Sequence, residues 1–327
     1  MKEDIFNIQI DAVIIWVDGN DKQWQEKINK FSKVKIDFGM KKESVRYNSI
    51  GEIDIAIKSI IKYASFINNI FLVTDNQIPE SFNKLQLLAK NKEVNLKIID
   101  HKVIFRDFEE YLPCFNSRSI ESVVFRIPNL SEHFILFNDD TFLMRETKSS
   151  DFFINGIPII RGKWKQFYEN SPFRVIYHKL RSSIGISVKI RPNGFKKIQQ
   201  TSAKLAGANR YVRRFHIPAN IRQSTLTSFF KENNLLKDNI KYRFRNENQF
   251  IIASLSEHIE INKNSYYYKR NTQLTYFRSY KSLFFIKLKL FCFLRQSKNI
   301  FMTFQSLELA DEKTLNYIFN WIDKRIN

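Results

Sequence analysis

Two adjacent carboxylates, Asp139 and Asp140, stand at the end of an apolar run and are the first candidates for chemistry. The run reads FILFNDDTFLM, from Phe134 to Met144, and Asn138 opens its polar step. Continuous apolar runs are typical of strands covered on both faces, and ligands in open α/β sheets bind where such strands end. Neighbouring carboxylates there repel each other unless a cation, a proton or a basic ligand shell compensates them. The pattern predicts a metal or diphosphate site, with two solvated aspartates capping a turn as the alternative.

The elements that must position this pair begin with a strand near the N-terminus. Ile10 to Asp18 has a β-branched core and ends at the turn signal Gly19-Asn20-Asp21. Asp21 is placed to cap a helix from Lys22 to about Phe31. Asp18 therefore follows a predicted strand just as Asp139 does.

Helix and strand signals then alternate through the first half. Helices are expected over 53–63, from Pro79 onward and over 117–127, with strands over 70–73 and 94–99. Such alternation implies right-handed crossovers and a largely parallel sheet. The strand ends at Asp18, Asp75 and Asp139 would then share one edge, where a nucleotide is expected.

The pattern weakens after Phe152. A hairpin is expected over 153–160 around Asn155-Gly156, and a helix over 218–231. Ser282 to Leu294, SLFFIKLKLFCFL, predicts a strand or a buried helix, with a membrane-surface element as the functional alternative. No GxxxxGK motif is present, which disfavours a P-loop kinase.

Composition gives one region an unusual charge. The 327 residues carry 53 Lys and Arg against 33 Asp and Glu, a net charge of +20, and 43% are hydrophobic. Residues 156–300 hold 29 basic and 6 acidic residues, so this region carries the whole excess. It should face something anionic, such as nucleic acid, lipid, a nucleotide diphosphate or a charged polysaccharide.

Cysteine usage and hydropathy bear on location. Cys114 and Cys292 are the two cysteines, with no CxxC spacing, which suits a reducing compartment. The first thirty residues lack the apolar core of a signal peptide, and no apolar stretch reaches the roughly 20 residues that span a bilayer. The expectation is a cytoplasmic protein, with peripheral contact to the inner face of the membrane left open.

Four blocks, in one order, resemble the Stealth family, the bacterial capsular polysaccharide phosphotransferases related to the catalytic subunit of animal GlcNAc-1-phosphotransferase. The first block is IDAVIIWVDGND (10–21), and the second covers 46–79 and continues at 115–143. The third is HIPANIRQSTLTSFF (216–230) with YRFRNENQF (242–250). The fourth, at 300–323, is weaker. The second block departs from the family pattern, since only Glu52 remains of an acidic-Asn-x-Glu-Leu-Arg run. The fourth block shows TFQS in place of a Cys-x-Asn-Asp core.

The resemblance implies a Rossmann-like, glycosyltransferase-A-like α/β fold with a mostly parallel sheet and a basic C-terminal elaboration. Residues 1–152 would form the nucleotide-sugar-binding core, and residues 153–327 a basic acceptor- and phosphate-binding portion that completes the same catalytic unit. The implied reaction transfers a sugar-1-phosphate from a nucleotide diphosphate sugar to a hydroxyl of a growing capsular or surface polysaccharide, and releases a nucleoside monophosphate.

Carried over residue by residue, the family's catalytic carboxylates fall on Glu121 and Asp140, and its histidine on His216. Its phosphate-binding arginine falls on Arg243 or Arg245, which alternate around Phe244 and would point to one face of a strand. The substrate-binding positions implied by the blocks are Trp16, Asp18, Gly19, Asp21, Arg46, Glu52, Asn116 and Arg222.

Elementary chemistry agrees with these roles. Phosphoryl transfer needs charge neutralisation, an aligned hydroxyl and a proton acceptor. Asp139 and Asp140 are candidates to hold Mg²⁺ or Mn²⁺ on the diphosphate, because hard cations take carboxylate oxygen. His216 is the candidate general base, since imidazole titrates near neutrality. His101, His133, His178 and His258 lack such support and are expected to be structural.

Two alternatives remain. A conventional glycosyltransferase of the same fold would release a nucleoside diphosphate. A non-enzymatic basic protein would bind a polyanion or a membrane through the basic region. Nucleic acid is not expected as a partner, because the acidic pair and Glu121 would place repulsive charge in its groove.

Overall fold

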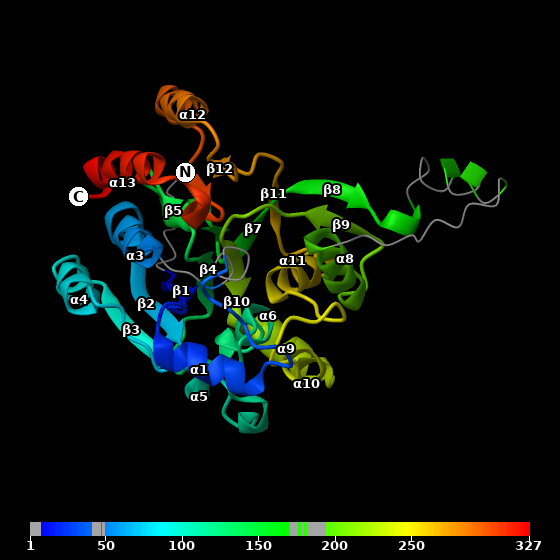
Figure 1. The fold of residues 1–327 in the computed structure, drawn as a ribbon. Helices are drawn as coiled ribbons and strands as arrows, with labels where there is room; N and C mark the ends of the chain where they lie inside the picture. The colour runs from blue at the N-terminus through cyan, green and yellow to red at the C-terminus, as the bar shows by residue number, and fades with distance from the viewer. Residues whose placement is uncertain are drawn as a thin grey trace.

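A five-stranded sheet organises the molecule, and four of its strands run parallel (Figure 1). The computed structural model describes residues 8–40, 47, 50–170, 176, 177, 180, 181, 183 and 194–327. The strands lie in the order β10 (Ala219–Arg222), β4 (His133–Asn138), β1 (Ile10–Ile15), β2 (Ile67–Thr74) and β3 (Asn95–Asp100). β10 alone is antiparallel to its neighbour, β4. The predicted α/β class with a mostly parallel sheet is confirmed.

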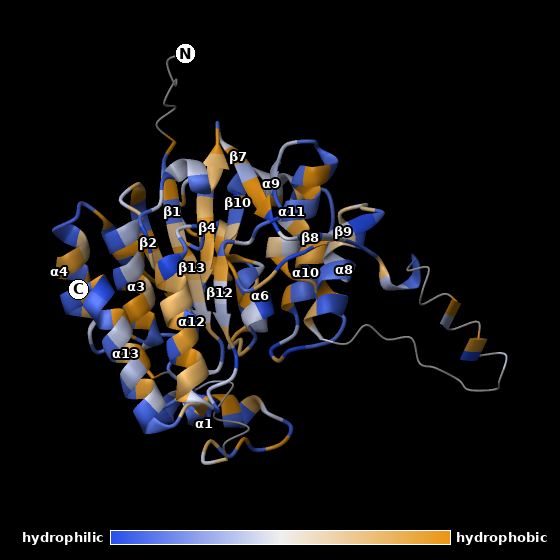
Figure 2. Ribbon diagram, turned by 90° about the horizontal axis from the view of Figure 1, so that it is seen from above, coloured by the Kyte–Doolittle hydropathy of each residue, from blue (hydrophilic) through white to orange (hydrophobic). Residues whose placement is uncertain are grey.

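Helices cover both faces of this sheet because its strands are apolar on both sides. Ile10, Ala12 and Ile14 of β1 pack into one core with α3 (Glu52–Tyr63), α4 (Phe82–Lys90) and α13 (Glu312–Ile326). Val13 lies in the opposite core, together with residues of α9 (Gln223–Lys231), α10 (Leu235–Ile240) and α11 (Ile252–Asn262). The helices stand on either side of the strands in Figure 2. Burial on two faces explains why these strands are continuous apolar runs.

A second sheet joins the two halves of the chain. β5 (Thr141–Leu143) follows β4 after two residues and pairs with β13 (Phe301–Phe304), which pairs in turn with β12 (Leu274–Phe277). β10, from the second half, also joins the central sheet. The remaining elements are α1 (Lys22–Phe31), α5 (His101–Ile104), α6 (Ser117–Glu121), β6 (Phe153–Ile154), β7 (Ile157–Arg161), β8 (Lys163–Gln166), α8 (Phe195–Leu205), β9 (Arg210–Arg213), β11 (Tyr267–Lys269) and α12 (Leu283–Arg295).

Local turn and capping signals were predicted correctly at two places. α1 begins at Lys22, and the Asp21 carboxylate accepts hydrogen bonds from the backbone amides of Gln23 and Trp24 at 2.9 and 3.3 Å. β6 and β7 form the expected antiparallel hairpin. Its turn holds Asn155 and Gly156 at φ values of 51° and 75°, the left-handed region that these two residue types tolerate best.

Two predicted elements are wrong in kind or extent, and the sequence of a third segment is compatible with two alternatives. The helix expected over 117–127 ends at Glu121 and gives way to a 3₁₀ turn over 124–126. The helix expected over 218–231 is a strand, β10, followed by α9. The segment over 282–294, expected to be a strand or a buried helix, is the helix α12, and one side of it is exposed. In each segment the apolar pattern fits two periods, so packing against distant elements decides between them.

Two further findings concern the chain as a whole. None of the helices that the structure describes has the length and apolarity needed to cross a membrane. Cys114 is buried and Cys292 is exposed, and both are free thiols.

Candidate active site

The acidic pair lies in the turn that leads from the central sheet into the second sheet. Asn138, the last residue of β4, is paired in register with Ile15 of β1. Asp139 and Asp140 follow, and β5 then departs to join β13. The backbone carbonyl of Asp140 accepts a hydrogen bond from the Phe304 amide at 3.1 Å, which fixes the turn against the C-terminal part of the chain.

Several carboxylates gather around this turn, and their pKa values are raised. Burial raises the pKa of Asp139 well above its usual range, and the neighbouring Asp140 and Glu52 carboxylates raise it further. Burial also raises the pKa values of Asp140 and Glu52. Burial takes the pKa of Glu308 to about 7, with Glu52 and Asp140 adding to the rise. The turn is therefore a place where positive charge would be bound favourably.

A basic wall faces the acidic pair. Glu121 ends α6, and its pKa is raised by burial although Arg245, Arg214 and Arg118 each act to lower it. Arg118 donates to the Asn246 carbonyl at 2.8 Å, and Arg245 donates to the Ser117 hydroxyl at 3.0 Å. Arg214 donates to the Ile217 carbonyl at 2.8 Å. Three guanidinium groups thus surround one carboxylate.

His216 is held between two aromatic rings. Its ring lies 5.6 Å from that of Phe195 and 5.3 Å from that of Tyr276, with interplanar angles of 19° and 8°. Burial lowers the pKa of His216, although the Asp140 carboxylate opposes this shift. The imidazole is consequently neutral at pH 7, the state in which it can accept a proton.

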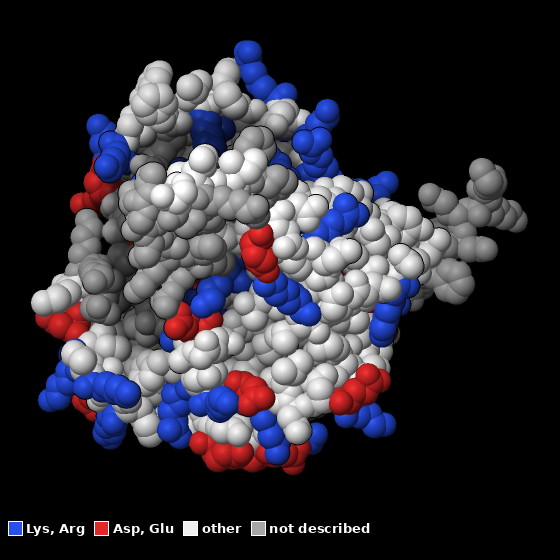
Figure 3. Space-filling view, turned by 90° about the vertical axis from the view of Figure 1, so that its right-hand side faces the viewer, with Lys and Arg blue, Asp and Glu red and all other residues white. Residues whose placement is uncertain are grey.

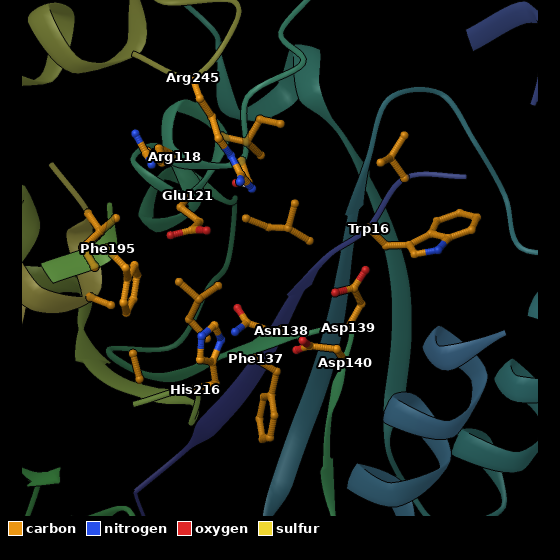
Figure 4. Close-up of a pocket in the computed structure, with 18 of the residues that line it drawn as sticks. Trp16, Arg118, Glu121, Phe137, Asn138, Asp139, Asp140, Phe195, His216 and Arg245 are labelled. Atoms are coloured by element: carbon orange, nitrogen blue, oxygen red, sulfur yellow. The ribbon is translucent and has the colours of Figure 1, made fainter. Parts of the chain in front are cut away.

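The acidic pair, Glu121, the three arginines and His216 line one cavity of about 390 Å³, the central cavity. Figure 4 shows Arg118, Arg245 and Glu121 on one side of it, Trp16, Asp139 and Asp140 on the other, and His216 at the lower edge, below Glu121. Acidic side chains, basic side chains and a neutral imidazole therefore meet in a space large enough for part of a small ligand.

The turn after β1 lies beside the cavity and is fixed by close packing and hydrogen bonds. A Cβ atom on Gly19 would lie 1.9 Å from the carbonyl oxygen of Tyr47, so only glycine allows this close approach. Asp18 accepts a hydrogen bond from the Asn20 amide at 2.9 Å, and the Asp21 carboxylate accepts one from Gln77 at 2.9 Å. Of the WVDGND block, Trp16 and Val17 line the cavity, whereas Asp18, Gly19 and Asp21 shape the turn.

Three further predicted site residues, besides those of the turn after β1, lie outside the cavity lining and hold the fold. Arg243 donates to the Glu110 and Leu112 carbonyls, both at 3.1 Å. Arg222 forms a paired contact with the buried Glu260, at 3.0 and 2.5 Å. Asn116, fully buried, is hydrogen-bonded to backbone and side chains around it. Arg46 falls outside the described residues, and Glu52 is buried beside Asp140 without lining the cavity.

The predicted strand around Phe244 is also wrong, because this segment has irregular backbone. Because the backbone is not a strand, the two arginine side chains do not point to the same face. Arg245 reaches the cavity, while the Arg243 guanidinium stacks 5.0 Å over the Phe31 ring. A single sequence gives no signal for this separation, because it depends on what the loop packs against.

Other lining residues were missed by reasoning from the sequence. His101, expected to be structural, lines the cavity with both ring nitrogens buried and without a hydrogen-bond partner among the described residues. Arg214 and Phe195 come from the region after Phe152, where the sequence pattern is weak. The position of His101 directly after a predicted strand, Val94 to Ile99, was the signal available for it.

Comparison with known proteins bears on this arrangement. Residues 46–159 match the family model described as Stealth protein CR2, conserved region 2. A capsular polysaccharide phosphotransferase of Haemophilus influenzae, Fcs1, is 42% identical over 147 residues, which is 45% of this chain and 38% of that protein. The capsular polysaccharide phosphotransferase CpsJ of Streptococcus thermophilus is 34% identical over 169 residues, which is 51% of this chain and 67% of that protein.

Solved structures share the chain path only distantly. The bifunctional glycosyltransferase WbbM has a TM-score of 0.46 at 11% identity, covering 98% of this chain and 50% of that one. The galactosyltransferase LgtC has a TM-score of 0.43 at 9% identity, covering 97% and 96%.

The matched part spans about two fifths of the length of the first curated relatives. Residues 46–159, which match the family model, contain the acidic turn and Glu121. The match to CpsJ spans two thirds of that protein. On this match, the chain belongs to the Stealth protein family.

Proposed function

We propose that this protein transfers a sugar-1-phosphate from a nucleotide diphosphate sugar to a hydroxyl of a capsular or surface polysaccharide, releasing a nucleoside monophosphate. The observation that carries the proposal is the convergence of Glu121, Asp140, His216 and Arg245 on one cavity. The names of the relatives, capsular and exopolysaccharide phosphotransferases, support the same reaction class.

The basic wall suits the phosphates of the donor. Guanidinium groups match phosphate oxygens in a forked geometry and remain charged at any physiological pH. Arg118, Arg214 and Arg245 lie together around Glu121 and line the cavity. Their charge would stabilise the phosphoryl oxygens as negative charge redistributes in the transition state.

The acidic turn suits a divalent cation bound together with the diphosphate. In the part of the chain that the structure describes, no three or more His, Cys, Asp or Glu side chains form a metal-binding group. Asp139 and Asp140 would therefore supply only part of a coordination shell, which fits Mg²⁺ because it usually keeps waters and takes oxygens from substrate phosphates. Bound there, Mg²⁺ would neutralise charge on the diphosphate. It would also stabilise the ionised form of both aspartates, which burial disfavours, as their raised pKa values indicate.

The acceptor would approach from the side of His216. The acceptor oxygen bonds to the phosphorus that carries the sugar, and the bond from this phosphorus to the bridging oxygen breaks. The bridging oxygen leaves with the nucleoside monophosphate, and the hydroxyl proton passes to a ring nitrogen of His216. Phe195 and Tyr276 hold the ring in place, and burial keeps it neutral beforehand. Glu121, on the basic wall, would orient the acceptor.

The nucleotide released distinguishes this reaction from its nearest alternative. The full chain is incubated with a panel of nucleotide sugars and a polysaccharide acceptor, and the released nucleotide is identified by chromatography. A nucleoside monophosphate, with phosphorus incorporated into the polymer, is expected. Release of a nucleoside diphosphate with no phosphorus in the product would instead assign a conventional glycosyltransferase.

The acidic residues and the metal give a first prediction. Asp140→Asn and Glu121→Gln should each lower turnover by about two to three orders of magnitude, the usual effect of removing preorganised electrostatic stabilisation. Chelation should abolish turnover, and added Mg²⁺ or Mn²⁺ should restore it. Glu80→Gln, at an exposed position, is the matched control. Near-normal turnover in either site variant, with unchanged circular dichroism, would remove that residue from the mechanism.

A further inference from the structure

Helix α12 exposes a row of large apolar side chains that the fold does not use. Three of its residues, Ile286, Leu290 and Phe293, are buried against the core. The exposed apolar side chains on the same helix are Phe284 (68%), Phe285 (68%), Leu288 (46%), Phe291 (49%) and Leu294 (47%). Apolar residues predominate along the helix, as its colour in Figure 2 shows, and they occur among both its buried and its exposed side chains. Helices that are apolar all round are normally buried, so the exposed side of α12 indicates a site that binds a partner.

The helix is held firmly in this position. The Phe293 ring packs edge-on against Trp321 of α13 at a centroid distance of 6.0 Å. Arg145 donates to the carbonyls of Phe293 and Gln296 at the C-terminal end of α12, at 2.6 and 2.5 Å. The exposed row is therefore a fixed surface of the folded protein.

The exposed residues are ordered across the helix surface. Phe284, Leu288 and Phe291 recur at i, i+4 and i+7 and so form one stripe. Lys287 and Lys289 emerge on opposite flanks of that stripe. Their ammonium groups lie 4.9 Å from the Tyr317 ring and 4.8 Å from the Phe277 ring. An apolar centre between basic flanks is the pattern of helices that lie in a membrane interface.

The surrounding chain has one sign of charge. Residues 261–307 contain nine Lys and Arg and no Asp or Glu. Lys281 precedes α12 and Lys298 follows it, and both are exposed. The partner that complements apolar side chains set among basic ones is a bilayer with anionic headgroups.

We propose that α12 docks this protein on an anionic lipid bilayer, lying in the plane of the interface with Phe284, Leu288 and Phe291 inserted. Its 13 residues amount to about 20 Å of helix, too short for a hydrocarbon core of roughly 30 Å, so the helix rests on the membrane and does not cross it. A second copy of the chain fits less well, because pairing this surface with itself would bring the same basic residues together.

The docking surface adjoins the acceptor side of the central cavity. Lys289 donates to the backbone carbonyl of Tyr276, the residue whose ring stacks on His216. Membrane docking would therefore bring the side of the cavity at His216 close to the lipid surface. This inference stands on α12 itself and does not depend on the proposed reaction.

Vesicle binding by the full chain tests the proposal. Binding is measured by co-sedimentation of the protein with vesicles. Vesicles of phosphatidylcholine containing about a third phosphatidylglycerol should bind the protein. Vesicles of pure phosphatidylcholine should bind it with at least tenfold lower affinity. The triple variant Phe284→Ser, Leu288→Ser, Phe291→Ser should bind anionic vesicles at least tenfold more weakly. Because these side chains face solvent, its thermal midpoint should remain that of the unmodified protein.

A matched control replaces three exposed apolar side chains far along the chain from α12: Ile78→Ser, Leu87→Ser, Val103→Ser. This control should bind vesicles normally. Equal loss of binding in the control and the α12 variant, or normal binding by the α12 variant, would overturn the proposal.

An inserted reporter tests position directly. Phe291→Trp should shift its fluorescence to shorter wavelength on anionic vesicles and be quenched by brominated lipid tails. Vesicle binding without either change would show that another surface of the protein binds the vesicles.

Analytical ultracentrifugation completes the test. A dimer that dissociates in the α12 triple variant, together with no vesicle binding, would assign the surface to a second copy of the chain.

Discussion

At the scale of single residues, Arg243 and Arg245 show how two like side chains two positions apart acquire different tasks. Arg245 lines the central cavity and acts on Glu121 electrostatically. Arg243 is tied to two backbone carbonyls and lies over the Phe31 ring. Arg245 faces the cavity, and Arg243 holds the loop that carries Arg245.

This difference predicts a clean contrast between two variants. Arg245→Ala should lower turnover at least tenfold and leave the melting temperature within about 2 °C, because its charge serves the cavity. Arg243→Ala should instead lower the melting temperature by several degrees, since it leaves two carbonyls without a donor and removes ring packing. Steady-state kinetics and thermal unfolding of both variants provide the measurement. The reverse pattern would exchange their roles.

Asp139 predicts a pH dependence of stability for the ligand-free protein. Its pKa rises from an ordinary value of 3.8 on folding, chiefly through burial. The folded protein therefore retains a proton that the unfolded chain has lost, so stability is full below 3.8 and decreases as pH rises through the raised pKa. Asp139→Asn imitates the protonated state.

The expected result is a melting temperature for Asp139→Asn that exceeds the unmodified value by roughly 2 °C or more at pH 9, and by less at pH 5. Thermal unfolding without metal or nucleotide at both pH values is the measurement, with Glu80→Gln as the exposed control. An increase that is the same at both pH values would mean that ionisation of Asp139 is not the cause.

At the scale of elements, the acidic turn depends on two sheets rather than one. β4 ends in the central sheet and β5 begins in the second sheet, so Asp139 and Asp140 occupy the only two residues between them. β13 holds this turn from the far end of the chain through Phe304. The junction explains how two half-buried carboxylates can lie side by side, since the strands on both sides are fixed independently.

A buried amide, that of Asn116, adds to the contacts that join α6 to the loop that carries Arg245. The Asn116 side chain donates to the Tyr242 and Phe244 carbonyls at 2.9 and 3.1 Å and to Gln249 at 2.9 Å, and it caps the helix that ends at Glu121. Asn116→Ala should lower the free energy of unfolding by about 2–4 kcal/mol, because buried carbonyls lose their donor. Chemical denaturation measures this change. Asn95→Ala, on the exposed side of β3, is the control and should cost less than about 1 kcal/mol.

At the scale of the whole molecule, charge is unevenly distributed along the chain. Residues 156–300 carry a net charge of +23, which exceeds that of the entire protein. On the face drawn in Figure 3, Lys and Arg stand at separate places with Asp and Glu between them along the lower edge, outside the area drawn in grey. On this face the positive charge is not gathered in one patch, and we expect the excess of basic residues along the chain to attract an extended anionic polymer.

This distribution predicts salt dependence for a polyanionic acceptor. Raising sodium chloride from about 50 to 300 mM should increase the KM for a phosphodiester-linked polymer several-fold, because screening weakens attraction between exposed charges. A short neutral acceptor should show little change in KM, and it controls for effects on the donor. Equal salt dependence for both acceptors would mean that the basic region does not hold the polymer.

The sequence by itself determined the features that depend on near neighbours along the chain. Apolar runs that end in polar residues located β1 and β4, and the acids that follow them, because burial on two faces leaves no polar position inside such a strand. Asp21 capped α1 as predicted, and Asn155-Gly156 turned the hairpin, because capping and left-handed backbone are properties of one or two residues.

Tertiary structure decided whatever depended on contacts between distant segments. Ser282 to Leu294 is compatible with a strand or a helix, and packing of Ile286, Leu290 and Phe293 on the core selected the helix. Arg222 was drawn into an ion pair with Glu260, 38 residues away, and His101 was placed in the cavity. The physical reason is that burial and charge compensation are properties of a site assembled from several elements, and no local pattern specifies which of them will meet.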